Sequence, residues 1–103
     1  MARGRPLVPS GCFPLLEYMV LGILRERHPL CAYGVYRALR ERGFQVNEGS
    51  VYRLLSKLRG EGLVEVVEVV DGRIRYGLTG RGLERLCELK RLLSSLLELG
   101  GEC

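Results

Sequence analysis

One short turn constrains this chain more than any other feature of its sequence. Asp71-Gly72 separates two β-prone runs, residues 63–70 and 73–78. An Asp-Gly pair between two such runs favours a type I′ turn, whose twist matches that of adjacent antiparallel strands. The sequence therefore predicts a two-stranded hairpin, with Arg73 and Arg75 on one face of its second strand.

Apolar residues recur at helical spacing on both sides of this hairpin, which predicts four helices. Asn47 is a good N-cap for the third helix, and Gly43 suits the left-handed residue that ends the second. Thr79 is the expected N-cap of the last helix. We place a short strand at 44–46, between the second and third helices. The predicted helices span about 15–27, 31–42, 48–59 and 80–100.

A chain of 103 residues, 47% of them hydrophobic, suffices for one domain with one core. The predicted order is helix, helix, short strand, helix, hairpin, helix. This order is typical of a winged helix-turn-helix, a mainly α fold with a small β hairpin, here with an extra C-terminal helix. We divide the chain into a flexible basic arm (1–13), a winged helix-turn-helix (14–78), and a dimerisation helix with its tail (79–103).

Charge is distributed unevenly along the chain. Residues 1–60 carry ten basic and four acidic side chains, whereas residues 61–103 carry six basic and eight acidic ones. A basic first part favours a polyanionic partner such as double-stranded DNA. A basic surface with no such partner has the same composition, so charge alone does not decide between them.

The third predicted helix has two contrasting faces, because valine and leucine fall on one side and polar residues on the other. Its N-terminal half enters the major groove in a helix-turn-helix, where Arg53 suits a guanine and Lys57 a phosphate. Ser50 is expected to offer a free backbone N–H to a phosphate. The alternative is a solvated charged face. The candidate DNA contacts are Tyr33, Ser50, Tyr52, Arg53, Lys57, Arg73 and Arg75.

Two of these assignments have specific structural alternatives. The rings of Tyr33 and Tyr52 can instead close the edge of the core. Arg73 and Arg75 can instead pair with glutamates across the hairpin.

Leucine dominates the last predicted helix. A stripe of four leucines has no partner inside a three-helix core, so we expect a second copy of the chain to cover it. The sequence thus predicts a homodimer. The stripe consists of Leu86, Leu89, Leu93 and Leu96.

Several other classes of protein are disfavoured. The spacing of the four cysteines does not fit a zinc site, and the residues are Cys12, Cys31, Cys87 and Cys103. We expect them to be reduced thiols, and the alternative is a redox switch or an intersubunit disulfide. No nucleophile with a base can be assembled around His28, the only histidine, so we predict no enzyme, metal or cofactor. We find no apolar run of membrane-spanning length and no secretory signal, and we expect a cytoplasmic protein.

Six segments of the chain together resemble the PadR family of transcriptional regulators. The most specific is the Gly-Ser-Val-Tyr start of the third helix, followed twenty residues later by Asp-Gly-Arg and a Leu-Thr-x-x-Gly helix start. The segments are Val-Leu-Gly-Ile-Leu (20–24), Pro-Leu-Cys-Ala-Tyr-Gly-Val-Tyr (29–36), Gly-Ser-Val-Tyr-Arg-Leu-Leu-Ser-Lys-Leu (49–58), Glu-Gly-Leu-Val (61–64), Asp-Gly-Arg (71–73) and Leu-Thr-Gly-Arg-Gly (78–82).

This resemblance implies a homodimeric repressor that binds a palindromic operator in double-stranded DNA, with the last helix as the dimer arm. It implies that Tyr52 contacts phosphate or base. It does not identify a small-molecule effector. Winged helices also dock proteins, so the alternative function is a protein-protein adaptor that does not bind DNA.

Overall fold

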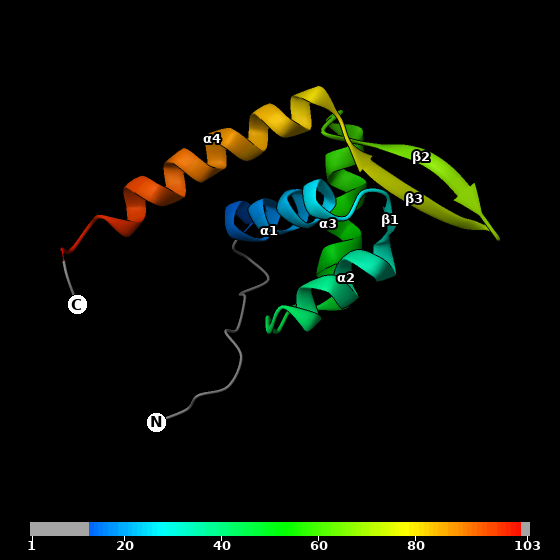
Figure 1. Ribbon diagram of the computed structural model, residues 1–103, viewed down its shortest axis with the longest axis horizontal. Coiled ribbons are helices and arrows are strands. Elements are labelled where there is room, and N and C mark those ends of the chain that lie inside the picture. Colours follow the sequence, from blue (N-terminus) through cyan, green and yellow to red (C-terminus); the bar gives the residue numbers. More distant parts are fainter. Residues whose placement is uncertain (1–12, 102–103) are drawn as a thin grey trace.

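A computed structural model describes residues 13–101 and contains four helices and a three-stranded antiparallel sheet (Figure 1). The strand order is β1-β3-β2, and β2 and β3 form the wing. This α+β architecture confirms the predicted fold class. No helix within the described range is long and apolar enough to cross a membrane. The elements are α1 (Phe13–Glu26), β1 (Leu30–Cys31), α2 (Ala32–Glu41), α3 (Glu48–Gly60), β2 (Val64–Val70), β3 (Arg73–Leu78) and α4 (Gly80–Leu97).

The turn of the hairpin has the geometry that its sequence predicts. Asp71 and Gly72 both have positive φ, 53° and 76°, as a type I′ turn requires, and the pairing of Val70 with Arg73 closes the hairpin. Further down, a register shift between Val66 and Glu68 marks a bulge in β2. A bulge increases strand twist, so the tip of the wing is turned relative to its base.

The predicted helix ends are confirmed by their hydrogen bonds. Asn47 Oδ1 accepts from the backbone N–H of Ser50 at 3.0 Å, and Thr79 Oγ1 accepts from that of Gly82 at 3.0 Å. Gly43, with φ 95°, ends the turn that follows α2. These caps fix where α3 and α4 begin, and therefore which residues fall in their first turns.

The short strand lies on the other side of α2 from the predicted one. Residues 44–46 show only an isolated bridge at Gln45, because the N–H of Phe44 is taken by Leu39 O (3.1 Å) in the turn that ends α2. Instead, Leu30 pairs with Tyr76 and Cys31 with Arg75. Cys31 is also the N-cap of α2 and is already extended (φ −75°, ψ 167°), so a strand continues directly into the cap.

The core is built around α1, which packs against α2, α3, α4 and β3. The expectation that Leu86 and Leu89 lack a partner within the chain is wrong, because α4 packs on α1 and leaves them only 7% and 1% exposed. The largest fully buried side chains are Leu16, Leu21, Leu24, Leu39, Leu54, Leu55, Leu58, Leu89, Val20, Val35, Val51 and Val64.

One ion pair joins α1 and α4 at the edge of this core. Arg85 on α4 donates from Nε to Glu17 Oε2 (2.9 Å) and from Nη2 to Glu17 Oε1 (3.3 Å). Glu17 is 5% exposed, and a carboxylate so deeply buried requires a charged partner. This hydrogen bond raises the pKa of Arg85 above its ordinary value, against the opposing effect of desolvation. The pair therefore ties α4 to α1.

Candidate nucleic-acid interface

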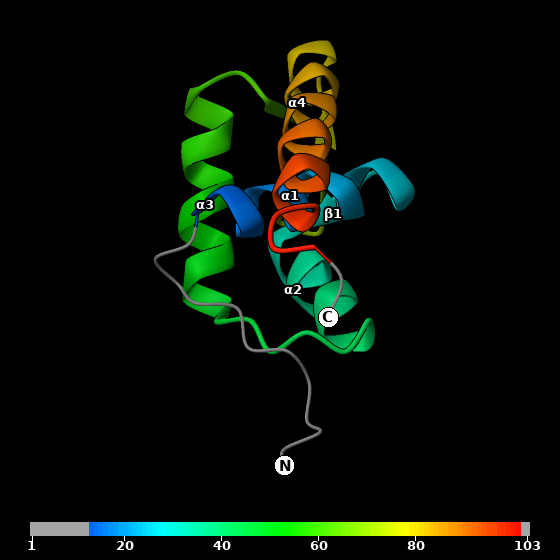
Figure 2. The same ribbon diagram turned by 90° about the vertical axis from the view of Figure 1, so that its left-hand side faces the viewer.

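The outer face of α3 is open along its length. The helix lies along one side of the body, and no other described element covers its outer side (Figure 2). Its inner face is closed by Val51, Leu54, Leu55 and Leu58, each at most 1% exposed. Three of the predicted contact residues, Tyr52, Arg53 and Lys57, are exposed to solvent, as a helix with this pattern demands.

Tyr52 is the aromatic side chain on this face and is 40% exposed. Its hydroxyl donates to Glu48 Oε2 at 2.8 Å, one turn earlier in the helix. This hydrogen bond, followed by desolvation and the negative charge of Glu48, raises the pKa of Tyr52 above its ordinary value. The hydroxyl therefore stays protonated at neutral pH and remains a hydrogen-bond donor.

Arg53 lies back over the start of α3. Its Nη2 donates to Ser50 Oγ at 3.2 Å, and a Cβ added at Gly49 would stand 3.2 Å from Nη1. The expected free N–H of Ser50 is not found, because Asn47 caps it, and the Ser50 side chain is 3% exposed. Ser50 thus accepts a hydrogen bond from Arg53, and its backbone N–H is not free for a phosphate.

Lys57 lies one turn further along the same face. Its Nζ contacts Glu61 Oε2 at 2.7 Å, in an ion pair that is about half exposed on both sides. Such pairs exchange readily with water and other charges, so this ammonium is available to a stronger anionic partner.

A shallow groove of about 550 Å³ separates α3 from the wing. Its walls bring together Tyr33 from the start of α2, Tyr52 from α3, and Arg73 with Ile74 from β3. The structure therefore gathers three predicted contact residues around one concave surface, although their positions span forty residues of sequence. Ile74, 38% exposed, is a lining residue that the sequence analysis did not single out.

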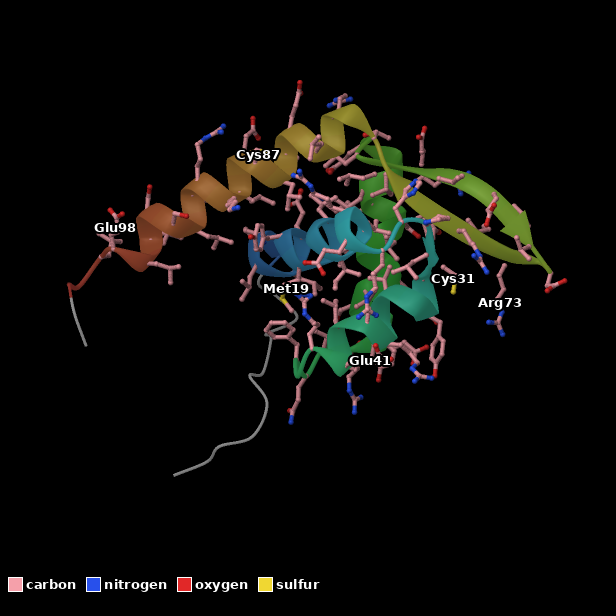
Figure 3. The ribbon with its side chains drawn as sticks, in the orientation of Figure 1. Met19, Cys31, Glu41, Arg73, Cys87 and Glu98 are labelled. Carbon is pink, nitrogen blue, oxygen red and sulfur yellow. The ribbon has the colours of Figure 1, made fainter. Side chains whose placement is uncertain are left out.

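The two wing arginines differ in their surroundings. Arg75 Nη1 lies 3.5 Å from Glu68 Oε2 across the hairpin, as one predicted alternative had it. Arg73 has no acidic partner within 4 Å among residues 13–101. Its side chain extends away from the hairpin on the side where Cys31 lies (Figure 3). Both arginines line a second groove, of about 490 Å³, beside β1.

The outer face of α2 adds basic residues that the sequence analysis missed. Tyr33 and Tyr36 stack with ring centroids 6.0 Å apart, and Arg40 donates to the Tyr36 hydroxyl at 2.7 Å. Arg37 lies with them around a groove on this helix. The sequence contained the pattern that predicts this cluster. Tyr36, Arg37 and Arg40 follow Tyr33 by three, four and seven positions, and this spacing places all four side chains on one side of the helix.

The cysteines in the described part of the chain are unpaired. Cys31 and Cys87 are free thiols, and Cys87 is exposed on α4. Cys12 and Cys103 lie outside the described residues, as do Arg3 and Arg5 of the predicted arm. Within residues 13–101, no three His, Cys, Asp or Glu side chains are grouped to hold a metal ion.

Comparison with known proteins gives a consistent answer. Residues 20–88 match the transcriptional regulator PadR-like family. A PadR-like transcriptional regulator from Bacillus cereus is 32% identical over 85% of this chain and 94% of its own, with a TM-score of 0.69. A PadR-like transcription factor from Bacteroides fragilis is 34% identical over 86% of each chain, with a TM-score of 0.67.

A third similar structure is Bacillus subtilis PadR in complex with operator DNA. It is 26% identical, with a TM-score of 0.64, over 72% of this chain and 46% of its own. No curated protein matches the chain. The family match covers most of the chain, and two solved PadR-like structures share about a third of its residues over nearly its whole length. The chain therefore belongs to the PadR-like family of transcriptional regulators.

Proposed function

We propose that this chain is a sequence-specific repressor that binds a palindromic operator in double-stranded DNA as a homodimer. The observation that carries the proposal is the open outer face of α3, with Tyr52, Arg53 and Lys57 exposed next to a wing. A helix in this setting fits the major groove. The complex of Bacillus subtilis PadR, a protein of similar fold, with operator DNA supports DNA as the partner.

Each side chain has a chemical role in this proposal. Arg53 can present its planar guanidinium to the O6 and N7 atoms of a guanine, whereas Lys57 supplies a point charge to a phosphate. From the walls of the groove, Tyr33 donates its hydroxyl to a backbone oxygen of the DNA, and Tyr52 contacts the DNA with its ring while its hydroxyl donates to Glu48. Arg73 and Arg75 reach the flanking phosphates or minor groove from the wing. Ser50 is left out of this set, because its donor is used within the helix.

The second half of the proposal assigns residues 14–78 to DNA and the segment from 79 onward to dimerisation. Beyond Leu89, α4 leaves the body of the molecule. Leu93 is half-buried there, and Leu96 and Leu97 are 49% and 83% exposed. Complete burial of a fully exposed leucine contributes about 1.5–3 kcal/mol, and these side chains contribute in proportion to the area that a second copy covers. Leu86 and Leu89 belong to the core, so the dimer surface is shifted toward Leu93 and Leu96.

Selection of bound fragments from a random duplex pool, repeated at several salt concentrations, tests the proposal. We expect a two-fold symmetric motif with half-sites one helical turn apart, about 34–36 Å, and retention that falls steeply with salt. An Arg53→Ala/Lys57→Ala double variant, checked for unchanged circular dichroism, should retain less DNA and should enrich a motif that lacks one base preference per half-site. Failure of the parent protein to retain DNA would contradict the proposal and favour the adaptor function.

A further inference from the structure

The three α3 side chains proposed to contact DNA each have a partner on the helix itself or at its end. Tyr52 donates to Glu48, Arg53 to Ser50 and Lys57 to Glu61. Two of these three partners are carboxylates. Acidic groups on a surface that meets phosphates lower its affinity for any DNA, so their presence there calls for a physical reason.

Glu48 is the carboxylate placed where an acidic group most affects contact with the bases. It is the first residue of α3 and is exposed, and the first turn of a recognition helix lies nearest the base edges. Glu61, in contrast, follows the last residue of α3 and is held by Lys57. Helix capping does not require Glu48, because Asn47 already caps the helix through its side chain. An acid in the first turn does complement the helix dipole, but any exposed carboxylate there would do so.

The carboxylate of Glu48 is also held in a defined place. Its Oε2 accepts from Tyr52 at 2.8 Å, and the second oxygen, Oε1, makes no hydrogen bond to any other described residue. The pairing uses the i,i+4 spacing, which directs both side chains along the outer face. Glu48 is exposed, so its Oε1 is an acceptor open to a ligand at the start of α3.

We propose that Glu48 is a specificity-determining residue, which accepts a hydrogen bond from the exocyclic N4 amine of a cytosine in each half-site. This inference rests on the proposed function, in which α3 enters the major groove. Cytosine is the base that presents a donor without an adjacent acceptor in that groove, and a carboxylate is its natural partner. Guanine and thymine present acceptors at the same place and are repelled, so Glu48 selects against wrong bases more than it adds affinity.

The competing account gives Glu48 a structural role only, as a partner of Tyr52 and of the helix dipole. The two accounts differ in what an amide does at this position. Glutamine keeps the size of the side chain and can still accept from Tyr52, but it adds a donor and pairs with adenine through N6 and N7. A structural role therefore leaves base preference unchanged in Glu48→Gln, whereas a reading role changes it.

The experiment is fragment selection from a random duplex pool with four proteins: the parent, Glu48→Gln, Glu48→Ala and Glu61→Gln. Glu61→Gln is the matched control, because it removes the same charge from the other end of α3. All four are first compared by circular dichroism, and each is then titrated with one random-sequence duplex. Should Glu48→Ala fold poorly, Glu48→Gln alone carries the test, since it retains the acceptor oxygen.

We expect the parent motif to contain one cytosine per half-site whose preference over the other bases is about tenfold or more. Glu48→Ala should abolish that preference and leave the rest of the motif intact, and Glu48→Gln should turn it toward adenine. All three variants should bind the random duplex several-fold more tightly, because each has lost one negative charge. Glu61→Gln should leave every base preference unchanged.

Two outcomes overturn the inference, and they are distinguishable. If the parent enriches a motif but both Glu48 variants enrich the same motif, Glu48 does not read a base and the proposed function stands. If the parent enriches no motif, the proposed function fails and the inference fails with it. A preference that shifts equally in Glu61→Gln also overturns it, since the effect would then come from charge alone.

Discussion

The two cations on the outer face of α3 are held in different ways. The guanidinium of Arg53 is fixed by Ser50 and fits over Gly49, whose missing Cβ leaves room for it. The ammonium of Lys57 is held only by an exposed pair with Glu61. A planar, oriented guanidinium suits bidentate recognition of a base, whereas a mobile point charge suits a phosphate.

Alanine at each of these positions should give different binding curves. Arg53→Ala should cost roughly 1–3 kcal/mol of operator binding and relax one base position per half-site. Lys57→Ala should weaken operator and random DNA alike and reduce the salt slope by about one unit. Fluorescence anisotropy over a salt series measures both effects. Variants that bind both DNAs as the parent does would exclude α3 as the recognition helix.

Tyr52 should report its contact with Glu48 through its own titration. Because the pKa of Tyr52 is raised in the folded protein, the contact stabilises the fold at neutral pH and is lost as the pH rises through the folded-state pKa, above about 10. Glu48→Ala removes both the acceptor and the negative charge, so it should return the pKa of Tyr52 toward its ordinary value. The pKa of Tyr52 is measured by absorbance during an alkaline titration. Subtracting the titration of the corresponding Tyr52→Phe protein removes the contribution of the other tyrosines. An unchanged pKa in Glu48→Ala would mean that the hydrogen bond is absent in solution.

Between elements, the position of α4 depends on close contact at its first turn. A Cβ added to Gly82 would stand 2.0 Å from the carbonyl oxygen of Leu63, which is backbone and also accepts from Thr79. At Gly80, two residues earlier, an added Cβ meets nothing within 4 Å. Only glycine therefore allows the first turn of α4 to lie this close to Leu63, the residue before β2.

Gly82→Ala should lower the free energy of unfolding by about 1–3 kcal/mol, because the backbone at Leu63 has to move. Gly80→Ala is the matched control and should be neutral or stabilising by up to about 1 kcal/mol, since alanine has the higher helix propensity. Urea denaturation followed by circular dichroism measures both. Equal midpoints for the two variants would refute the close approach.

The pair of Glu17 and Arg85 should behave as a buried link between α1 and α4. Arg85→Met leaves the Glu17 carboxylate without a charged partner, although Glu17 is only 5% exposed. We expect the free energy of unfolding to fall by about 2 kcal/mol. This is less than for a fully buried pair, because the Arg85 side chain is 39% exposed and water screens it. Adding Glu17→Gln to this variant removes the buried charge and should restore much of the loss. Denaturation of the two single variants and the double variant measures the coupling, and additive effects would argue against it.

At the scale of the whole molecule, whose longest dimension is 47 Å, α4 and the wing extend from the body in opposite directions (Figure 1). Exposed leucines gather on the free part of α4, and an apolar surface of this kind on a small protein marks an interaction site. A second copy bound there would leave the outer face of each α3 open.

Leu96→Glu should convert the proposed dimer into a folded monomer. Leu96 is 49% exposed within one chain, so the charge costs the single subunit little while it is costly to bury between two. Light scattering gives the mass, and circular dichroism shows that the helices persist. Ser94→Glu places the same charge on another side of α4 and should remain a dimer. A Leu96→Glu protein with the mass of the parent would contradict this interface.

The elements that the sequence alone determined are those that depend on near neighbours. The Asp71-Gly72 turn, the Asn47 and Thr79 caps, and the buried and open faces of α3 all follow from residues within four or five positions of one another. Backbone conformation and local hydrogen bonds decide such features, and a pattern of residue types records them.

Only the tertiary structure decided which distant segments meet. It paired Leu30 and Cys31 with β3, covered Leu86 and Leu89 with α1, joined Glu17 to Arg85, and gathered Tyr33, Tyr52 and Arg73 around one groove. One local feature was nevertheless predicted wrongly. The Asn47 cap, which the sequence indicates, uses the backbone N–H of Ser50, so this N–H was not free as expected. Contacts across tens of residues depend on how whole faces pack in three dimensions, and helical or strand periodicity shows that a face is apolar without showing what covers it.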